Sequence, residues 1–380
     1  MTSNETWSVA AASRRGASHI RSGTPCQDAC GSWSAAFAGS HCQILAVSDG
    51  HGADEYHHSH FGSFLAIRAA YEEFVEFFQW YSLLKTAPSN VEGLQPSGLE
   101  RDFKAGFARR VVRRWRENVK AFQRDVLKVE DAGDDSSEHR YRAFGCTLLA
   151  AMVTKDRAFF FQLGDGGVFI RKNDGEIYSL VEDDEEPGEA TDSLASRDPE
   201  KTAITSAVSL DDLSAVMLAT DGLTKSFTKG KDETVSKGIR QTMGWLVNRV
   251  TAQKLDVEGP VFDKFLDSCS EGGTGDDVTV AIAFSRQKLH GDIQSRCDHI
   301  GQGLSETEPE NPKNSEAFVA TVTQESSTKD SSEGSEAAEL SSRDDVVKTK
   351  VSSGQLDSKA MPPDNEVKSD GASTEAGDVF

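Results

Sequence analysis

The sequence predicts a fold that combines short β-strands with long amphipathic helices. Short apolar runs recur along the chain and are bounded by glycine and acidic residues, which is typical of buried strands. Two longer segments carry large apolar side chains at steps of three and four residues, which is the spacing of one helix face. A third observation concerns function: several of the apolar runs adjoin an Asp–Gly or Gly–Asp sequence.

Length and charge limit the classes of function. The chain has 380 residues, 37% of them hydrophobic, and a formal net charge of −21. This length suits one large domain with a tail. An acidic chain lacks the basic face of a nucleic-acid binder and is repelled by anionic membranes, so we expect neither partner. No apolar run is long enough to span a bilayer or to act as a secretory signal. We therefore expect a cytoplasmic monomer with reduced cysteines.

The first half of the chain is expected to hold two strands and two long helices. Residues 7–13 form the first strand, and a loop rich in Gly, Ser and Pro follows over residues 16–29. Residues 44–48 are a short aliphatic strand that ends in Asp-Gly-His-Gly. Helices are expected over residues 53–85 and 99–129, each with a broad apolar face toward the core.

The second half is expected to supply most of the sheet and then a tail. Further strands are expected at residues 144–153, 157–163, 167–171, 215–220 and 278–284, with helices at 235–252 and 261–270. Residues 182–201 are acidic and rich in turn formers, so we expect an irregular excursion there that can cover a site. Residues 287–380 carry too few apolar side chains to offset chain entropy. We therefore expect a folded domain over 1–286 and a disordered, acidic, Ser-rich tail over 287–380.

Four acidic sequences at strand ends indicate a metal site. They contain Asp49, Asp165, Asp221 and Asp276, which lie far apart in the sequence. A single Asp–Gly pair is more often a simple turn. The repetition is informative, because strand ends meet when the strands are neighbours in a sheet. Carboxylates, backbone carbonyls and water are the ligands that Mg²⁺ and Mn²⁺ prefer.

Two side chains near these sequences suit phosphate chemistry. His51 follows Asp49 by two residues and can give or take a proton near neutral pH. The guanidinium of Arg21 can bind a tetrahedral oxyanion through two nitrogens. The alternative interpretation of Arg21 is a solvated surface arginine.

Taken in order, the motifs resemble those of the metal-dependent protein Ser/Thr phosphatases of the PPM type, also called type 2C. The resemblance covers about residues 7–286. It rests on Asp49-Gly50-His51-Gly52, Gly145-Cys146-Thr147, Gly164-Asp165-Gly166, Asp221-Gly222 and Gly275-Asp276-Asp277. In addition, Ser18-His19-Ile20-Arg21 followed by Pro25-Cys26-Gln27-Asp28 is similar to a divergent bacterial-style branch of the family.

The resemblance implies a fold and an activity. The implied fold is α+β, a four-layer αββα sandwich of two antiparallel β-sheets flanked by helices. The implied activity is hydrolysis of phosphoserine and phosphothreonine in phosphorylated proteins by a metal-activated water. Two Mg²⁺ or Mn²⁺ ions would be the cofactors, with a third, weaker site.

The resemblance also implies roles for individual residues. Asp49 would bridge both ions, the Gly50 carbonyl would bind one of them, and Asp221 and Asp276 would hold the other. Asp165 matches a residue near the third metal. The implied catalytic residues are His51 as the general acid for the leaving group, together with Arg21 and Asp28.

Three features depart from the family pattern. Gln27 stands where an acidic residue is common, and it would bind a metal-held water more weakly. Lys225 stands where many members carry an acid, so we expect the third metal to be weak or absent. The spacing from Arg21 to Gln27 is longer than usual, which makes His19 the other candidate for the phosphate ligand.

A second function remains open at this point. The same fold can serve as a catalytically weak module that binds phosphoproteins and regulates them. Such a module would be expected to have lost one of Asp49, Asp221 and Asp276. All three are present, which favours the active phosphatase.

Overall fold

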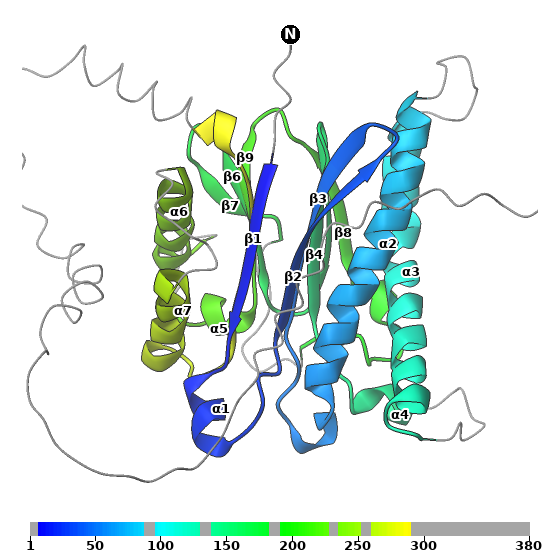
Figure 1. Ribbon diagram of the computed structural model, residues 1–380, viewed down its shortest axis with the longest axis vertical. Coiled ribbons are helices and arrows are strands. Elements are labelled where there is room, and N and C mark those ends of the chain that lie inside the picture. Colours follow the sequence, from blue (N-terminus) through cyan, green and yellow to red (C-terminus); the bar gives the residue numbers. More distant parts are fainter. Residues whose placement is uncertain are drawn as a thin grey trace, which may run out of the picture. The chain divides into compact units, whose positions relative to one another are not determined.

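Two β-sheets packed face to face form the centre of the protein. The structure is a computed structural model that describes residues 7–86, 96–129, 138–181, 191–227, 235–251 and 260–289. Two five-stranded antiparallel sheets lie between two layers of helices (Figure 1). This confirms the expected α+β sandwich of four layers. Apart from residues 287–289, the expected tail lies outside the described residues, as does the 182–190 part of the expected excursion.

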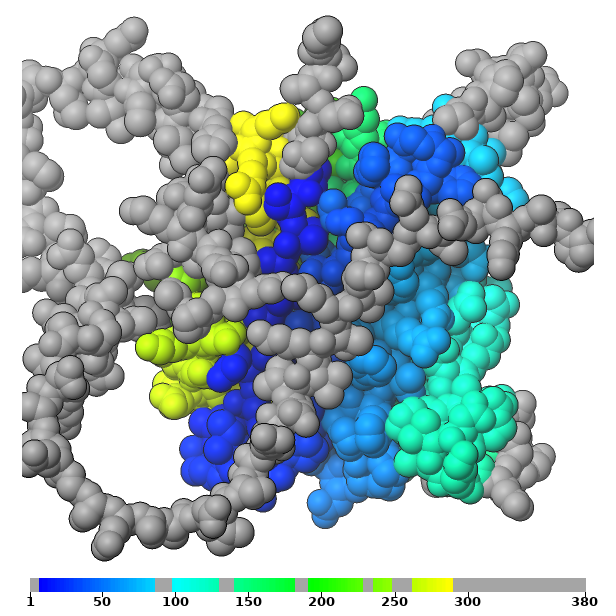
Figure 2. Space-filling model, viewed as in Figure 1, coloured from blue at the N-terminus to red at the C-terminus, as the bar shows by residue number. Residues whose placement is uncertain are grey.

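Each sheet is built from strands of both halves of the chain. The first sheet has the order β1 (Trp7–Arg14), β10 (Val278–Ser285), β9 (Leu213–Ala219), β6 (Gly167–Lys172) and β7 (Ile177–Ser179). The second has the order β2 (Ala29–Phe37), β3 (Ser40–Ser48), β4 (Leu148–Val153), β5 (Arg157–Leu163) and β8 (Ile204–Ser209). The edge strands β1 and β2 contact each other and lie on the face seen in Figure 2.

Helices cover the outer face of each sheet. The second sheet is covered by α2 (Ser59–Thr86) and α3 (Pro96–Asp125), and the first by α6 (Lys237–Thr251) and α7 (Pro260–Gly272) (Figure 1). Short helical turns connect the layers: α1 (Ala17–Ser22), η1 (Asp54–Tyr56), α4 (Glu138–Arg142), η2 (Pro199–Lys201) and α5 (Asp221–Thr224). No helix among the described residues is both long and apolar enough to cross a membrane.

Three apolar clusters fill the three interfaces between the four layers. Strand β3 shows how the sequence builds two of them, because successive side chains of a strand point to opposite faces. Ile44 and Ala46 face the α2–α3 layer, whereas Leu45 and Val47 face the other sheet. A strand buried on both faces needs apolar residues at every position, which explains the continuous run before Asp49. The third cluster joins the first sheet to α6 and α7.

The predicted elements agree with the structure except near the site and at the sheet edges. The helix expected from residue 53 begins at Ser59, because Asp54–Tyr56 forms a 3₁₀ turn. The loop expected over residues 16–29 contains the short helix α1. Strands β2, β7 and β8 were not expected, and many of their side chains are only half-buried. The described cysteines, Cys26, Cys30, Cys42, Cys146 and Cys269, are free thiols.

Candidate active site

The antiparallel topology brings the acidic sequences to one end of the sandwich. Strands β3, β5, β9 and β1 finish at this end, while β2, β4, β6 and β10 begin there. The register shows it directly, since Ser48 pairs with Ala29, Leu163 with Leu148, Ala219 with Gly167 and Arg14 with Val278. Asp28, Asp49, Asp165, Asp221 and Asp276 each lie next to one of these strand ends. Pairing between neighbouring strands therefore brings together acidic residues that are far apart in the sequence.

The turn that carries Asp49 is held by the backbone of the Gly145-Cys146-Thr147 segment. Thr147 N donates to Asp49 O at 2.8 Å, and Asp49 N donates to Thr147 Oγ1 at 3.0 Å. His51 N donates to Gly145 O at 3.1 Å. A Cβ atom on Gly145 would lie 2.6 Å from Tyr56 Cδ1 and 3.0 Å from His51 Cδ2, so this position has no room for a side chain. The motif therefore acts as a template for the Asp49 turn.

Asp28 is tied to the ends of two strands of the other sheet. Thr220 Oγ1 donates to Asp28 Oδ2 at 2.8 Å and accepts a hydrogen bond from Thr279 N at 3.1 Å. Thr220 directly follows β9 and Thr279 belongs to β10, so this contact connects the two sheets at the site. Thr220 was not singled out from the sequence, because a threonine after a strand carries no distinguishing signal.

The neighbours Asp276 and Asp277 have different surroundings. The Asp277 side chain is 1% exposed, and its oxygens accept hydrogen bonds from Gly16 N at 2.6 Å and Gln27 N at 2.5 Å. The Asp276 side chain is 45% exposed, and its Oδ1 accepts only the Asp277 N–H, at 2.8 Å, among the described residues. Asp277 thus joins three segments of the chain, whereas Asp276 has an oxygen free for a ligand. Nothing in the sequence distinguishes Asp277 from its neighbour Asp276.

The acidic groups raise one another's pKa. Loss of hydration raises the pKa of Asp49, and the nearby charges of Asp28, Asp221 and Asp276 raise it further. Loss of hydration and the Asp277 charge raise the pKa of Asp28 in the same way. The pKa of Asp276 is also raised, mainly by loss of hydration. Without a cation, this end of the sandwich favours protonated carboxyls.

One carboxyl oxygen of Asp221 indicates that a metal ion fits this site. Its Oδ1 atom is buried and finds no hydrogen-bond donor among the described residues. Loss of hydration opposes ionisation of Asp221, but the proximity of Asp49 and the hydrogen bond from Lys225 outweigh it and lower the pKa. A buried acceptor oxygen without a donor is costly unless a cation binds it. The all-oxygen set of Asp49, Asp221 and Asp276 suits Mg²⁺ or Mn²⁺.

Lys225 lies between two of the acids. Its Nζ is 2.7 Å from Asp165 Oδ2 and 2.7 Å from Asp221 Oδ2. Thr191 Oγ1 also donates to Asp165 Oδ2, at 3.0 Å. The side chain of Asp165 is 7% exposed, while that of Lys225 is 55% exposed. The ammonium group therefore neutralises Asp165 from the solvent side.

His51 lies beside the acids with one ring nitrogen unpaired. Its Nε2 is buried and finds no partner among the described residues. The ring contacts Tyr56 edge-on, with 4.8 Å between centroids. Loss of hydration lowers the pKa of His51, and the charges of Asp165 and Asp221 partly offset that shift. A neutral ring with a free nitrogen at this position can exchange a proton with a bound group.

The structure does not bring Arg21 to the acids. Arg21 is exposed on α1, and no contact of its side chain with the acidic residues is found within the described part of the chain. Residues two apart on a helix point about 200° apart, and His19 on the same helix faces Asp277. Arg21 therefore points away from the acids. Arg15, which precedes α1, is half-buried, and its Nη2 donates to His19 O at 3.1 Å.

Gln27 has a structural role that requires an amide side chain rather than a carboxylate. Its Nε2 donates to Ser59 Oγ at 2.7 Å and to His51 O at 3.2 Å. An acidic side chain has no N–H to donate to these oxygens. The amide therefore fastens the Asp49–His51 turn to the start of α2.

Comparisons with known proteins identify the family. A family model described as protein phosphatase 2C matches residues 15–257. Among solved structures, the serine/threonine phosphatase Stp1 from Staphylococcus aureus is similar at 15% identity and TM-score 0.44, covering 75% of this chain and 97% of that one. The PstP/Ppp phosphatase of Mycobacterium tuberculosis has 17% identity and TM-score 0.40, covering 73% and 98%. A PstP catalytic domain in complex with two manganese ions has 18% identity and TM-score 0.41, covering 73% and 97%.

No curated protein matches the chain. The two-sheet sandwich with a carboxylate cluster at one end defines a metal-dependent hydrolase. The family model covers more than half of the residues, so the chain belongs to the protein phosphatase 2C family. It is a metal-dependent protein serine/threonine phosphatase, and its substrates are phosphoproteins.

We expect divalent metal to stabilise the fold, because a cation relieves repulsion among the carboxylates. At a free Mn²⁺ concentration 100-fold above the dissociation constant, the wild type should gain about 2.7 kcal/mol over its stability in EDTA. Asp49→Asn removes the central charge, so it should melt higher than the wild type in EDTA and gain much less from Mn²⁺. Thermal unfolding followed by circular dichroism measures both effects.

The exposed carboxylate of Asp102 on α3 provides the control. Asp102→Asn makes the same chemical change away from the site and should respond to Mn²⁺ as the wild type does. Equal melting temperatures of the wild type in EDTA and in Mn²⁺ would contradict the metal interpretation of the cluster.

Proposed function

We propose that the chain hydrolyses phosphoserine and phosphothreonine in proteins at a centre of two Mg²⁺ or Mn²⁺ ions. The observation that carries this proposal is the environment of Asp49. Its carboxyl is poorly hydrated and lies among the charges of Asp28, Asp221 and Asp276, which raise its pKa. Without a cation, such a cluster of poorly hydrated carboxyls would lower the stability of the fold.

The resemblance to the family implies the metal ligands, and the oxygens of Asp221 and Asp276 that lack hydrogen-bond donors support them. We assign Asp49 to both ions, the Gly50 carbonyl to one of them, and Asp221 and Asp276 to the other. When bound, two such ions lower the pKa of a water molecule and neutralise the phosphoryl oxygens. A phosphate monoester is very stable in water, so its hydrolysis needs this charge stabilisation.

The remaining work belongs to side chains of the protein. We assign Asp28 to orient the attacking water, since its carboxyl lies near Asp49 and Thr220 holds it in place. We assign His51 to deliver a proton from its ring nitrogen to the leaving serine or threonine oxygen. Arg21 has no part in this proposal, because its side chain is exposed on the far side of α1 from His19.

The alternative of a non-catalytic phosphoprotein-binding module is less favoured. Such a module would be expected to have lost one of Asp49, Asp221 and Asp276, and all three are present. Gln27 is neutral in a position that is commonly acidic. Gln27 has a structural function through Ser59 and His51 O, so its presence does not indicate a degraded site.

We further propose a cytoplasmic monomer that binds neither nucleic acid nor membranes. The net charge of −21 supports the exclusion of the two partners, because nucleic acid and anionic membranes both repel an acidic chain.

The division into a phosphatase domain over 1–286 and a tail over 287–380 is also a proposal. The contacts of Lys288 and Leu289 indicate where a truncated chain should end. Leu289 is 1% exposed and belongs to the apolar cluster beneath α6 and α7, and Lys288 Nζ donates to Leu210 O. A truncated chain should therefore keep Leu289.

The experiment that tests the function is hydrolysis of an aryl phosphate and of a phosphothreonine peptide by the full chain. Turnover should require Mn²⁺ or Mg²⁺ and should disappear in EDTA. Asp49→Asn should lower kcat/KM by at least about a thousandfold, on the order of losing 4 kcal/mol of transition-state stabilisation. Asp102→Asn should retain wild-type turnover. A folded wild type that binds Mn²⁺ but hydrolyses neither substrate would favour the binding module.

A second prediction concerns Lys225, whose ammonium group occupies the space between Asp165 and Asp221. Because this single positive charge contacts both acids and offsets part of their negative charge, we expect no third metal in the wild type. Lys225→Asp should replace the ammonium with a third carboxylate and raise bound Mn²⁺ by about one ion per chain at millimolar metal. Equilibrium dialysis with elemental analysis measures this number. Lys104→Asp, an exposed change on α3, is the control, and an unchanged metal count in Lys225→Asp would refute the assignment.

A third prediction tests the domain boundary. A chain that ends at Leu289 should hydrolyse the aryl phosphate within about twofold of the full chain and should unfold at the same temperature, because the described core is complete at that residue. A chain that ends at Arg286 should be less stable, since burial of a leucine side chain contributes about 1.5–3 kcal/mol. A large loss of turnover in the longer of the two truncated chains would show that the tail belongs to the domain.

A further inference from the structure

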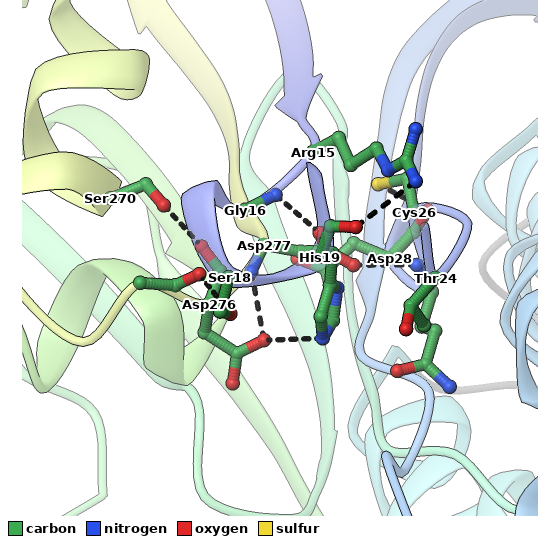
Figure 3. A network of polar contacts seen from close by, with 12 residues as sticks. Arg15, Gly16, Ser18, His19, Thr24, Cys26, Asp28, Ser270, Asp276 and Asp277 are labelled. Atoms are coloured by element: carbon green, nitrogen blue, oxygen red, sulfur yellow. Dashed lines mark hydrogen bonds and ion pairs between the residues drawn. The ribbon is translucent and has the colours of Figure 1, made fainter. Parts of the chain in front are cut away.

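The His19 side chain lies between the carboxyls of Asp276 and Asp277. Its Nδ1 is 2.9 Å from Asp277 Oδ1, and its Nε2 is 3.7 Å from Asp276 Oδ1 (Figure 3). The side chain is 17% exposed. We propose that His19 is a nitrogen ligand of the ion held by Asp276, and that it makes the site prefer Mn²⁺ over Mg²⁺. This inference rests on the metal centre proposed above and adds a ligand to it.

The surroundings of Asp277 determine which ring nitrogen carries the proton. Both Asp277 oxygens already accept backbone N–H groups, from Gly16 and from Gln27. Such a carboxylate is an acceptor, so the contact at 2.9 Å requires His19 to donate from Nδ1. In a neutral ring this leaves a lone pair on Nε2. The nitrogen that faces Asp276 is therefore a metal ligand rather than a donor to phosphate.

The distance between Nε2 and Asp276 Oδ1 suits two ligands of one ion. At 3.7 Å the two atoms are too far apart for a direct hydrogen bond. Two ligands that each lie about 2.1 Å from a metal are about 3.0–3.5 Å apart in tetrahedral or octahedral geometry. A movement of a few tenths of an ångström would bring both atoms to that separation. One ligand atom each of His19, Asp276 and Asp277 already lies within 4.8 Å of the others.

The backbone holds His19 at this point. Ser18 N donates to Gly275 O at 2.9 Å, Ala17 N donates to Ser270 Oγ at 2.9 Å, and Arg15 Nη2 donates to His19 O at 3.1 Å (Figure 3). The segment before β10 and the helix α1 are thus fixed to each other. A buried carboxylate that orients a histidine through its other nitrogen is the usual outer support of a metal-binding imidazole. Asp277 has that position here.

The chemistry of imidazole gives the consequence for metal choice. Mg²⁺ prefers oxygen ligands, whereas nitrogen ligands favour transition metals, whose affinity also rises along the series that starts at Mn²⁺. A centre with one nitrogen ligand should therefore bind Mn²⁺ more tightly than Mg²⁺. Replacing His19 with an amide that offers oxygen should reduce that preference.

Pulsed electron paramagnetic resonance of the full chain loaded with Mn²⁺ tests the inference directly. The wild type should show ¹⁴N modulation from a bound imidazole, and ¹⁵N labelling of histidine should convert it to the ¹⁵N pattern. The modulation should be lost in His19→Gln and kept in His41→Gln, which changes an exposed histidine of β3. By equilibrium dialysis, His19→Gln should weaken Mn²⁺ binding by at least about 10-fold, the smallest loss typical even of an outer-shell partner, and Mg²⁺ binding less.

The outcomes separate this inference from the proposed function. Mn²⁺ binding without ¹⁴N modulation in the wild type, or with modulation that survives in His19→Gln, would overturn the role of His19 and leave the metal centre intact. Unchanged Mn²⁺ affinity in His19→Gln with a raised KM would assign His19 to the phosphate group and also overturn the inference. A wild type that binds no Mn²⁺ would remove the metal centre itself. The isotope experiment can overturn the inference without a variant, because a wild type that binds Mn²⁺ without modulation has no histidine ligand.

Discussion

Repulsion among carboxylates at one end of the sandwich is the constraint on which the site depends. Acids from both sheets meet there, and their shared loss of hydration raises the pKa of Asp28, Asp49 and Asp276. The fold tolerates this because three rigid interfaces hold the strands, so the strand ends cannot separate to relieve the repulsion. This repulsion is present before a cation binds. Cation binding is therefore more favourable, since the cation removes the repulsion among the carboxylates and also gains their oxygens as ligands.

The hydrogen bonds around the cluster divide the acids by function. Asp277 is saturated by backbone N–H groups and by His19, so it serves the architecture. Asp165 accepts hydrogen bonds from Lys225 and Thr191, both through Oδ2. Asp221 and Asp276 keep oxygens without donors. A metal binds most readily to an oxygen that keeps a lone pair free of N–H and O–H donors. This difference separates Asp221 and Asp276, which we propose as ligands, from Asp277, which supports the backbone.

The sequence predicted the acids well because a strand that ends in Asp–Gly is a local pattern. It predicted the helices and most strands for the same reason, since apolar periodicity is local. The role of Asp277 could not be predicted, because its partners Gly16 and Gln27 lie 261 and 250 residues away. Arg21 had the right chemistry for phosphate, but the direction of its side chain depends on α1, where the contact of His19 with Asp277 fixes the helix phase. Strand β2 was missed because its half-buried residues leave only a weak alternation.

The two departures from the family pattern at Gln27 and Lys225 act in the same electrostatic direction. A neutral amide in place of an acid removes one negative charge, and a lysine in place of an acid removes one and adds a positive charge. Together they make the site about three charge units less negative, which lowers its demand for cations. The charge on Lys225 is covalently attached, so neither dilution nor a chelator can remove it from Asp165. Only the central acids, around Asp49, still depend on free metal. The metal requirement of this phosphatase is therefore concentrated on the central pair of ions that we propose.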